Sequence, residues 1–258
     1  MISILITNYN KSKFLKQTLR SIQLNKRKKY EIILFDDVST DNSLEIIKKF
    51  RNIKLIRNKK KIYRSSALNQ IHGILECFKI SKGNIICLLD GDDRFTKNKL
   101  NLVYKKLNKK NIDCIFDLPK ESKKRFHLKL KNKRYSIWPT IIPTSCISFK
   151  RTFFIRFLKF LKKGKYGNLE IDARITIFSK FYLDQFNVIP NKLTFYGFDS
   201  NGITSRIKKF SIKWWIRRYE AFKYLQFILK MRKKPFKAGI DYYLTCLIFF
   251  SIKNLRVQ

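Results

Sequence analysis

The chain has 258 residues, of which 45% are hydrophobic and 15% aromatic, so it can build one large domain with a substantial core. This composition argues against intrinsic disorder. Its 58 Lys and Arg residues against 18 Asp and Glu residues give a net charge of +40, and its five cysteines form no Cys-x-x-Cys pair, which argues against a disulfide framework or a zinc site.

The charge has three interpretations: nucleic-acid binding, attraction to an anionic membrane surface, or a compositional bias with lysines on a solvated face. We favour the last and place the membrane surface second, because basic and large apolar residues alternate near the C-terminus. We expect no nucleic-acid partner, since the sequence has no zinc-finger spacing, RNA-recognition aromatic motif or clear helix-turn-helix. No apolar run approaches the roughly 18 residues of a spanning helix. We therefore expect a cytoplasmic protein, with peripheral attachment to the inner face of the membrane left open.

Strand and helix patterns alternate through the first half of the chain. Short apolar runs predict buried strands at residues 2–7, 30–35, 53–56 and 84–89. We interpret the first run as a strand and not as a signal peptide. Periodic apolar positions predict helices at 11–24, 44–50 and 66–80. Ser12 is a candidate cap for the first helix, and Asp41 or Ser43 for the second. This order predicts an α/β fold with a Rossmann-like, mainly parallel sheet flanked by helices on both faces.

The pattern is weaker after residue 110. A helix is predicted at 169–181, with Glu170 and Asp172 near its positive end, followed by a strand within 182–194. From residue 208 onward, aromatic residues mixed with Lys and Arg predict two helices with a break near Pro235. These helices have either the chemistry of an interfacial helix or that of helices packed on the preceding domain, and the sequence leaves both open.

Three polar clusters follow three of the predicted strands. They are Thr7-Asn8-Tyr9-Asn10, Asp36-Asp37 and Asp90-Gly91-Asp92-Asp93. Ligands of open parallel sheets bind outside the carboxyl ends of the strands, so the topology predicts one ligand site at this rim.

The third cluster has the chemistry of a metal site. Clustered carboxylates repel one another unless a cation neutralises them, and their hard oxygen atoms suit Mn²⁺ or Mg²⁺, which also bind a diphosphate. The alternative is an acidic surface turn. The apolar strand before Asp90 and the scarcity of acids in this chain favour the metal site. Asp37 could accept hydrogen bonds from a nucleobase or ribose; the alternative there is an Asx-turn, which Asp41 and Ser43 fit better.

Residues 4–10 (ILITNYN), 35–43 (FDDVSTDNS) and 88–93 (LLDGDD) resemble, in order and spacing, the family 2 inverting glycosyltransferases. Residues 64–69 also resemble a family segment in which a basic residue lies beside the donor. The similarity covers residues 1 to about 105, is thinner to about 205 and is weak beyond. Val38 departs from it, since glycine is commonest at that position in the family.

The resemblance implies a glycosyltransferase A fold and a nucleotide-diphosphate sugar as donor, with a UDP-sugar favoured. Asp37 would contact the base and Asp92 the ribose or the metal. The donor-binding residues expected in this way are Thr7, Asn8, Tyr9, Asp37, Arg64, Asp90 and Asp92. The resemblance places the Mn²⁺ or Mg²⁺ ion on Asp93 and Asp92.

Inverting transfer also needs a general base that deprotonates the acceptor hydroxyl. Many relatives carry an adjacent Glu-Asp pair for this role, whereas this chain has Ile171 between Glu170 and Asp172. The run Asp172-Ala173-Arg174 resembles a variant in which the Asp alone is the base. We favour Asp172, keep Glu170 as the second choice, and note the alternative of a carboxylate that stabilises the helix start.

The sequence thus predicts a catalytic domain at residues 1–205 and a basic, aromatic-rich helical extension at 206–258. The predicted function is metal-dependent inverting transfer of a sugar to a glycan or lipid-linked acceptor, in cell-surface polysaccharide or lipid-linked glycan synthesis. The alternative is an anionic-membrane or nucleic-acid binding protein with a decayed donor site, which the +40 charge motivates.

Overall fold

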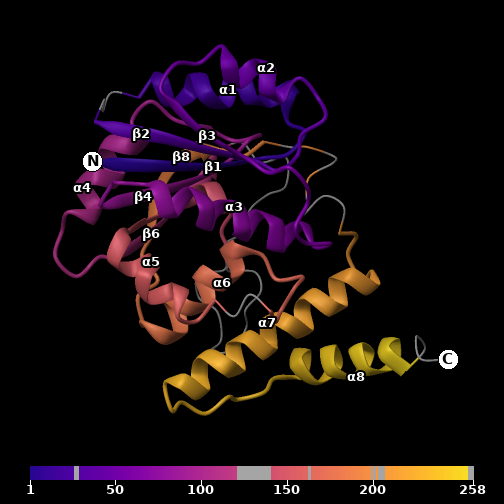
Figure 1. Cartoon of the computed structure of the whole chain (residues 1–258). Coiled ribbons are helices and arrows are strands. Elements are labelled where there is room, and N and C mark those ends of the chain that lie inside the picture. Colours follow the sequence, from indigo (N-terminus) through magenta and orange to yellow (C-terminus); the bar gives the residue numbers. More distant parts are fainter. Residues whose placement is uncertain are drawn as a thin grey trace.

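The computed structural model describes residues 1–25, 29–120, 141–161, 164–197, 199, 202 and 207–254. Within them, eight strands form one sheet in the order β3-β2-β1-β4-β7-β6-β8-β5 (Figure 1). The strands are β1 (Ile2–Asn8), β2 (Tyr30–Asp36), β3 (Ile53–Arg57), β4 (Ile85–Asp90), β5 (Arg94–Phe95), β6 (Cys114–Lys120), β7 (Ile147–Lys150) and β8 (Val188–Phe195). The helices are α1 (Ser12–Gln23), α2 (Ser43–Lys48), α3 (Ser66–Ile80), α4 (Lys99–Leu107), α5 (Arg151–Leu158), α6 (Ile171–Ile177), α7 (Ile212–Met231) and α8 (Ile240–Asn254), with a 3-10 turn η1 (Thr144–Cys146) and a π-helical turn η2 (Phe178–Tyr182).

The first four strands in the sheet order are parallel, which confirms the prediction for the first half of the chain. β1 pairs with β2 and β4, and β2 pairs with β3. The register places Thr7 opposite both Phe35 and Asp90, and Asn8 opposite Asp36. The ends of these strands are therefore level, as the topology requires for a common rim. β7 runs antiparallel to β4, so the complete sheet is mixed.

Helices cover both faces of the sheet and divide the core in two. One core contains residues of α1, α2 and α4, and the other contains residues of α3, α5, α6 and α7. Successive residues of β1 alternate between them, because side chains along a strand point to opposite faces. Ile4 and Ile6 enter the first core, and Leu5 enters the second. Four of the five cysteines are buried and all five are free thiols, as expected for core residues in the absence of disulfides.

One carboxylate, that of Asp41, serves the N-terminal ends of two helices. It accepts the backbone N–H of Ser12 at 2.9 Å and that of Ser43 at 3.0 Å. The prediction that Ser12 caps α1 is wrong, because the residue before the helix is Lys11 and its side chain makes no capping hydrogen bond. An acid from a neighbouring loop replaces the local cap.

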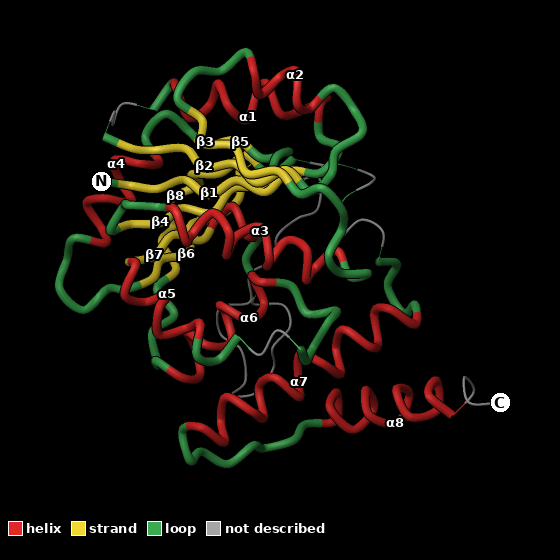
Figure 2. Tube along the Cα trace, viewed as in Figure 1, coloured by secondary structure: helices red, strands yellow, loops and turns green. Residues whose placement is uncertain are grey.

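The two C-terminal helices are present, with the predicted break around Pro235, and they differ in their packing. α7 lies against the second core and buries Phe222, Leu225 and Ile228. α8 lies beside α7 on the side away from the sheet (Figure 2), and Thr245 is its buried residue. The described part of the chain contains no helix that is both long and apolar enough to cross a membrane. The boundary expected at residues 205 and 206 lies outside the described residues.

Candidate active site

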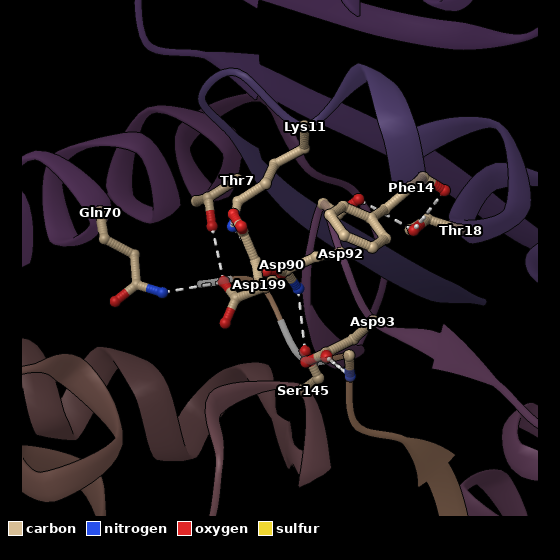
Figure 3. Close-up of polar contacts among 12 residues, drawn as sticks. Thr7, Lys11, Phe14, Thr18, Gln70, Asp90, Asp92, Asp93, Ser145 and Asp199 are labelled. Atoms are coloured by element: carbon tan, nitrogen blue, oxygen red, sulfur yellow. Dashed lines mark hydrogen bonds and ion pairs between the residues drawn. The ribbon is translucent and has the colours of Figure 1, made fainter. Parts of the chain in front are cut away.

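Asp90 ends β4 and is held by three neighbours. Its Oδ1 accepts hydrogen bonds from Thr7 Oγ1 at 2.9 Å and from Gln70 Nε2 at 2.8 Å (Figure 3). Its backbone N–H donates to Ser145 Oγ at 2.9 Å. Burial and the charge of Asp92 raise the pKa of Asp90 to about 6, against the effect of the two hydrogen bonds. Asp90 therefore joins β1, α3 and β4 at the rim, and sequence reasoning missed Gln70 as its partner.

Asp92 forms an ion pair with a lysine that sequence reasoning also missed. Lys11 Nζ lies 2.5 Å from Asp92 Oδ2 and 2.5 Å from Asp199 Oδ2 (Figure 3). Burial by itself would lower the pKa of Lys11, but the two carboxylates outweigh it and raise the pKa. The rim therefore carries a positive charge directly beside its acidic cluster.

Asp93 is buried, and one of its carboxylate oxygens is unsatisfied. Its Oδ1 accepts the backbone N–H of Gly197 at 2.7 Å, whereas its Oδ2 has no hydrogen-bond partner among the described residues. Burial, followed by the charges of Asp92 and Asp90, raises the pKa of Asp93 well above its usual range. A buried oxygen without a partner is costly, and a cation or a proton on this carboxylate removes that cost.

Gly197 follows β8 and touches the acidic turn. A Cβ atom at this position would lie 2.1 Å from the backbone oxygen of Asp92. Only glycine permits this approach, which brings the Gly197 N–H to Asp93. The segment after β8 therefore closes over the Asp92-Asp93 turn.

The carboxylates fit a hard divalent cation in chemistry, and the number of protein ligands is small. No set of three or more His, Cys, Asp or Glu side chains in the described ranges is arranged to hold a metal. Mg²⁺ often uses only one or two carboxylates and takes its remaining ligands from water and substrate phosphates. Asp92 and Asp93 agree with that kind of site.

The residues expected around the nucleotide lie at the ends of β1 and β2. Asp37 is buried, and Asn58 Nδ2 donates to its Oδ1 at 3.3 Å. The side chain of Asn8 points into the rim, where its Nδ2 donates to Asp36 Oδ2 at 2.8 Å. Tyr9 is exposed, and Lys61 Nζ lies 3.6 Å from its ring centroid. Tyr9 is thus exposed at the rim and Asp37 is buried at the end of β2, whereas Asn8 mainly ties β1 to β2.

Arg64 precedes α3 and is exposed. Asn69 fixes the backbone beside it, accepting the Tyr63 N–H at 2.9 Å and donating to the Tyr63 oxygen at 2.8 Å. The segment that the sequence associated with the donor is therefore an ordered turn at the N-terminal end of α3. No described contact joins Arg64 to the acidic cluster.

The two acids considered as the base lie at the start of α6. Asp172 is half-buried, and its Oδ1 accepts the backbone N–H of Ala173 at 2.6 Å. Burial and the charge of Glu170 raise the pKa of Asp172 to about 7, and Arg217 opposes them. Glu170 Oε2 accepts a hydrogen bond from Arg217 Nε at 2.5 Å. A carboxylate with a pKa near 7 is suited to accept a proton at neutral pH.

Charges of the acidic cluster and of Asp172 shift the pKa values of common neighbours. Burial, followed by the charges of Asp93, Asp90 and Asp172, raises the pKa of the Tyr196 hydroxyl. Asp90 also contributes to the raised pKa of Asp172. Carboxylates that are 79 to 82 positions apart in the chain thus act on the same groups. The fold brings the predicted base and the predicted donor cluster together.

Comparison with known proteins gives one family match and several relatives. The profile of Glycosyl transferase family 2 matches residues 3–170. The uncharacterized glycosyltransferase MG060 of Mycoplasma genitalium is 28% identical over 155 residues, which is 55% of this chain and 52% of that protein. The UDP-Glc:alpha-D-GlcNAc-diphosphoundecaprenol beta-1,3-glucosyltransferase WfaP of Escherichia coli is 33% identical over 102 residues, 39% of each chain. The matched region thus spans about half of MG060 and less of WfaP.

Two solved structures share the fold. S. aureus TarS 1–349 in complex with UDP-GlcNAc has a TM-score of 0.67 at 14% identity, covering 96% of this chain and 70% of that one. The mannosyltransferase PcManGT of Pyrobaculum calidifontis in complex with GDP-Man and Mn²⁺ has a TM-score of 0.60 at 14% identity, covering 92% and 65%. At this level of identity the likeness shows the fold, which is the glycosyltransferase A fold that the sequence predicted.

Proposed function

The chain belongs to glycosyltransferase family 2, and from this membership we propose that it transfers a sugar, with inversion, from a nucleotide-diphosphate sugar to an acceptor hydroxyl. The observation that supports the proposal is that Asp93 and Asp92 of the acidic cluster and the half-buried Asp172 all raise the pKa of the same hydroxyl, that of Tyr196, which is consistent with one shared site. Each half of that site has a role in the reaction. The first binds an anionic donor, and the second accepts a proton.

The donor is a nucleotide-diphosphate sugar, and we favour uridine as the nucleotide. Asp37 accepts hydrogen bonds from the base, and Thr7 and Tyr9 border the same pocket at the end of β1. Lys11, which pairs with Asp92 and Asp199, partly offsets the negative charge of the acidic cluster where the anionic diphosphate would bind. The UDP-GlcNAc bound to TarS agrees with this choice for a protein of the same fold.

A divalent cation, Mn²⁺ or Mg²⁺, completes the donor site on Asp93 and Asp92. Bound there, it supplies positive charge to the diphosphate of the donor. The Oδ2 of Asp93 supports this role, because a buried carboxylate oxygen that has no hydrogen-bond partner among the described residues is a natural ligand for a hard cation. The Mn²⁺ bound to PcManGT gives the same support from a related fold.

Asp172 is the general base of the transfer step. Its carboxylate takes the proton of the acceptor hydroxyl while that oxygen forms a bond to the anomeric carbon of the donor sugar. The bond between the anomeric carbon and the diphosphate oxygen breaks, and its electron pair leaves with the nucleoside diphosphate. Attack on the face opposite the leaving group inverts the anomeric centre. Glu170 is the second candidate for this role.

The test of the donor site is the isosteric variant Asp93→Asn. It keeps the hydrogen bond from Gly197 but removes the charge. We expect UDP binding in the presence of Mn²⁺, measured by calorimetry, to weaken on the order of tenfold or more, with little change without metal. Asp113→Asn is the control, since Asp113 pairs with Arg156 and Lys150 outside the site. Equal metal-dependent affinity in both variants would exclude Asp93 as a ligand.

We propose that the acceptor is a glycan or lipid-linked sugar and that the enzyme works at the inner face of an anionic membrane. α8 presents an apolar stripe to solvent, with Ile240, Tyr243 and Leu247 exposed by 87%, 64% and 67%. Exposed cations, among them Lys233 and Lys237, precede this helix. An apolar face bordered by cations is the pattern of a helix that lies in a lipid interface.

Vesicle sedimentation tests the membrane contact. The chain should sediment with vesicles that contain phosphatidylglycerol and should not sediment with pure phosphatidylcholine vesicles. Leu247→Glu should abolish the effect, whereas Leu24→Glu, an exposed leucine at the end of α1, should not. The competing function, a nucleic-acid or membrane binder with a decayed donor site, predicts no calorimetric UDP binding together with salt-sensitive duplex binding. The presence of both Asp93 and Asp172 argues against a decayed donor site.

A further inference from the structure

α7 belongs to the extension that the sequence separated from the catalytic domain, yet two of its side chains reach the segment before α6. Glu220 accepts the backbone N–H of Asn168 at 2.7 Å and its side-chain Nδ2 at 2.8 Å. Arg217 Nε donates to Glu170 Oε2 at 2.5 Å. α7 thus contacts and holds the short segment that carries Glu170 and the proposed base Asp172.

The contact between Arg217 and Glu170 is buried. The side chains are exposed by only 12% and 6%. A surface ion pair contributes little, whereas loss of one partner from a buried pair leaves the other charge uncompensated. Within the described chain, Arg217 is the ion-pair partner of Glu170. The orientation of the Glu170 carboxylate therefore depends on α7.

Four groups act on the carboxyl of Asp172. Glu170 lies just before α6, the backbone N–H of Ala173 lies in α6, Arg217 lies on α7 and Asp90 ends β4. Burial, Glu170 and Asp90 favour the protonated form of Asp172, whereas Arg217 favours the carboxylate. Arg217 is the cation among them.

We propose that Arg217 is a positioning residue of the transfer reaction, which holds Glu170 in a buried ion pair and by its own positive charge keeps Asp172 available as a base. It fixes the Glu170 carboxylate by a buried hydrogen-bonded ion pair and adds a positive charge on the same side of the site. The extension therefore completes the catalytic centre. This inference rests on the proposed function, in which Asp172 accepts the acceptor proton.

The test compares Arg217→Met with Glu170→Gln in the full chain. The pKa of Asp172 is read by ¹³C NMR titration of labelled Asp carboxyls, with Asp172→Asn to assign the signal. Removal of the positive charge disfavours the carboxylate, so Arg217→Met should raise the midpoint by about one pH unit. Removal of the negative charge does the opposite, so Glu170→Gln should lower it.

The second readout is the pH profile of UDP release from UDP-GlcNAc with Mn²⁺, which should move with the NMR midpoint. Below the midpoint Asp172 is protonated and cannot act as the base, so Arg217→Met should lose on the order of tenfold in rate at neutral pH and recover at higher pH. Arg217→Lys should restore part of the loss. Arg218→Met is the matched control, because Arg218 faces Asp241 of α8 instead and should leave the profile unchanged.

Melting curves and UDP binding establish that each variant is folded. If Arg217→Met does not fold, Arg217→Lys and Glu170→Gln still give the two opposite shifts. An Asp172 midpoint that is the same in the native chain and in the Arg217 variants overturns the inference. A shifted midpoint in a chain that binds no UDP and releases none from its sugar donor instead contradicts the proposed function, and leaves the role of Arg217 on Asp172 established.

Discussion

Val38 lies directly after Asp37 and has a backbone φ of 61°, in the left-handed region that glycine adopts without cost. A β-branched residue in this conformation brings its Cβ close to the following carbonyl oxygen, at a cost of roughly 1–2 kcal/mol. Val38, which departs from the family pattern, therefore has a backbone conformation that glycine adopts without cost, and the strain lies next to the expected base-binding carboxylate.

Val38→Gly should stabilise the fold. Relief of the left-handed strain outweighs the entropy that glycine adds to the unfolded chain, which is about 0.5–1 kcal/mol, so a gain of up to about 1 kcal/mol in the free energy of unfolding is expected. Urea unfolding measures it. Val38→Ala, which removes the branch and keeps the Cβ, should gain less. A destabilised glycine variant would mean that packing of the valine methyl groups exceeds the strain.

Gly197 gives a second residue-scale prediction. In Gly197→Ala the new Cβ would lie 2.1 Å from the Asp92 backbone oxygen, so the turn or the strand end must move. We expect a destabilisation of about 1–3 kcal/mol and weaker UDP binding with Mn²⁺, because the N–H bond to Asp93 is lost. Gly164→Ala is the control, since nothing lies within 4 Å of its Cβ. Equal melting points and affinities in the two variants would contradict the close approach.

The acids of the site could be predicted from the sequence, but their partners could not. Asp90, Asp92 and Asp93 stand out in a chain with 18 acidic residues, whereas Lys11 is one of 58 basic residues. Lys11 meets Asp92 across 81 positions and Asp199 across 188. Such contacts depend on the complete topology, so no local pattern indicates them. The same holds for Arg217.

At the scale of elements, the alternation of strands and helices could be predicted as far as β4 because their apolar patterns are undisturbed. The later elements α4 and β6 were not predicted. Lys99, in the first turn of α4, is fully buried and pairs with Asp117 of β6 at 2.6 Å. Charged residues in a core break the apolar periodicity on which sequence reasoning depends. α5 was missed as well, in the part of the chain where the pattern is weak.

Asp41 carries the element-scale prediction, since it accepts N–H groups at the starts of both α1 and α2. Asp41→Ala should lower the free energy of unfolding by about 1–2 kcal/mol. Asp41→Asn keeps an acceptor oxygen and should lose less. Chemical unfolding at neutral pH measures both, and an alanine variant as stable as the native chain would show that water replaces the carboxylate at both helix starts.

The pKa of Asp41 adds a pH dependence to this comparison. Burial opposes ionisation, but hydrogen bonds from Ser43 and Ser12 outweigh it and lower the pKa below its ordinary value. A lowered folded-state pKa gives stability that is present above the unfolded pKa, near 4, and is lost as the pH falls through the folded value. As the pH falls below 5, the free energy of unfolding of the native chain should therefore decrease more than that of Asp41→Asn. Parallel losses would assign the acid sensitivity to other carboxylates.

At the scale of the whole molecule, the two helices of the extension have different roles, which composition alone left open. One face of α7 is core, and its polar side chains reach the base segment. In α8 only Thr245 is buried among the described residues, and five large apolar residues are exposed: Ile240, Tyr243, Leu244, Leu247 and Phe250. The sequence presents both helices as mixtures of aromatic and basic residues, and only the burial of each side chain distinguishes a core helix from a surface helix. We therefore propose that residues 1–205 and the extension do not fold as two independent units.

Truncation at two points tests this division. A chain that ends at residue 238 lacks α8 and should keep a cooperative melting transition and UDP binding, with a modest loss of stability because Tyr242 no longer packs on Phe222. A chain that ends at residue 210 also lacks α7, and with it the burial of Phe222, Leu225 and Ile228. Each buried side chain contributes about 1.5–3 kcal/mol, and whole domains are stable by only 5–15 kcal/mol. The shorter chain should therefore aggregate or melt without cooperativity, whereas a stable, UDP-binding chain of 210 residues would show that the extension is an appendage.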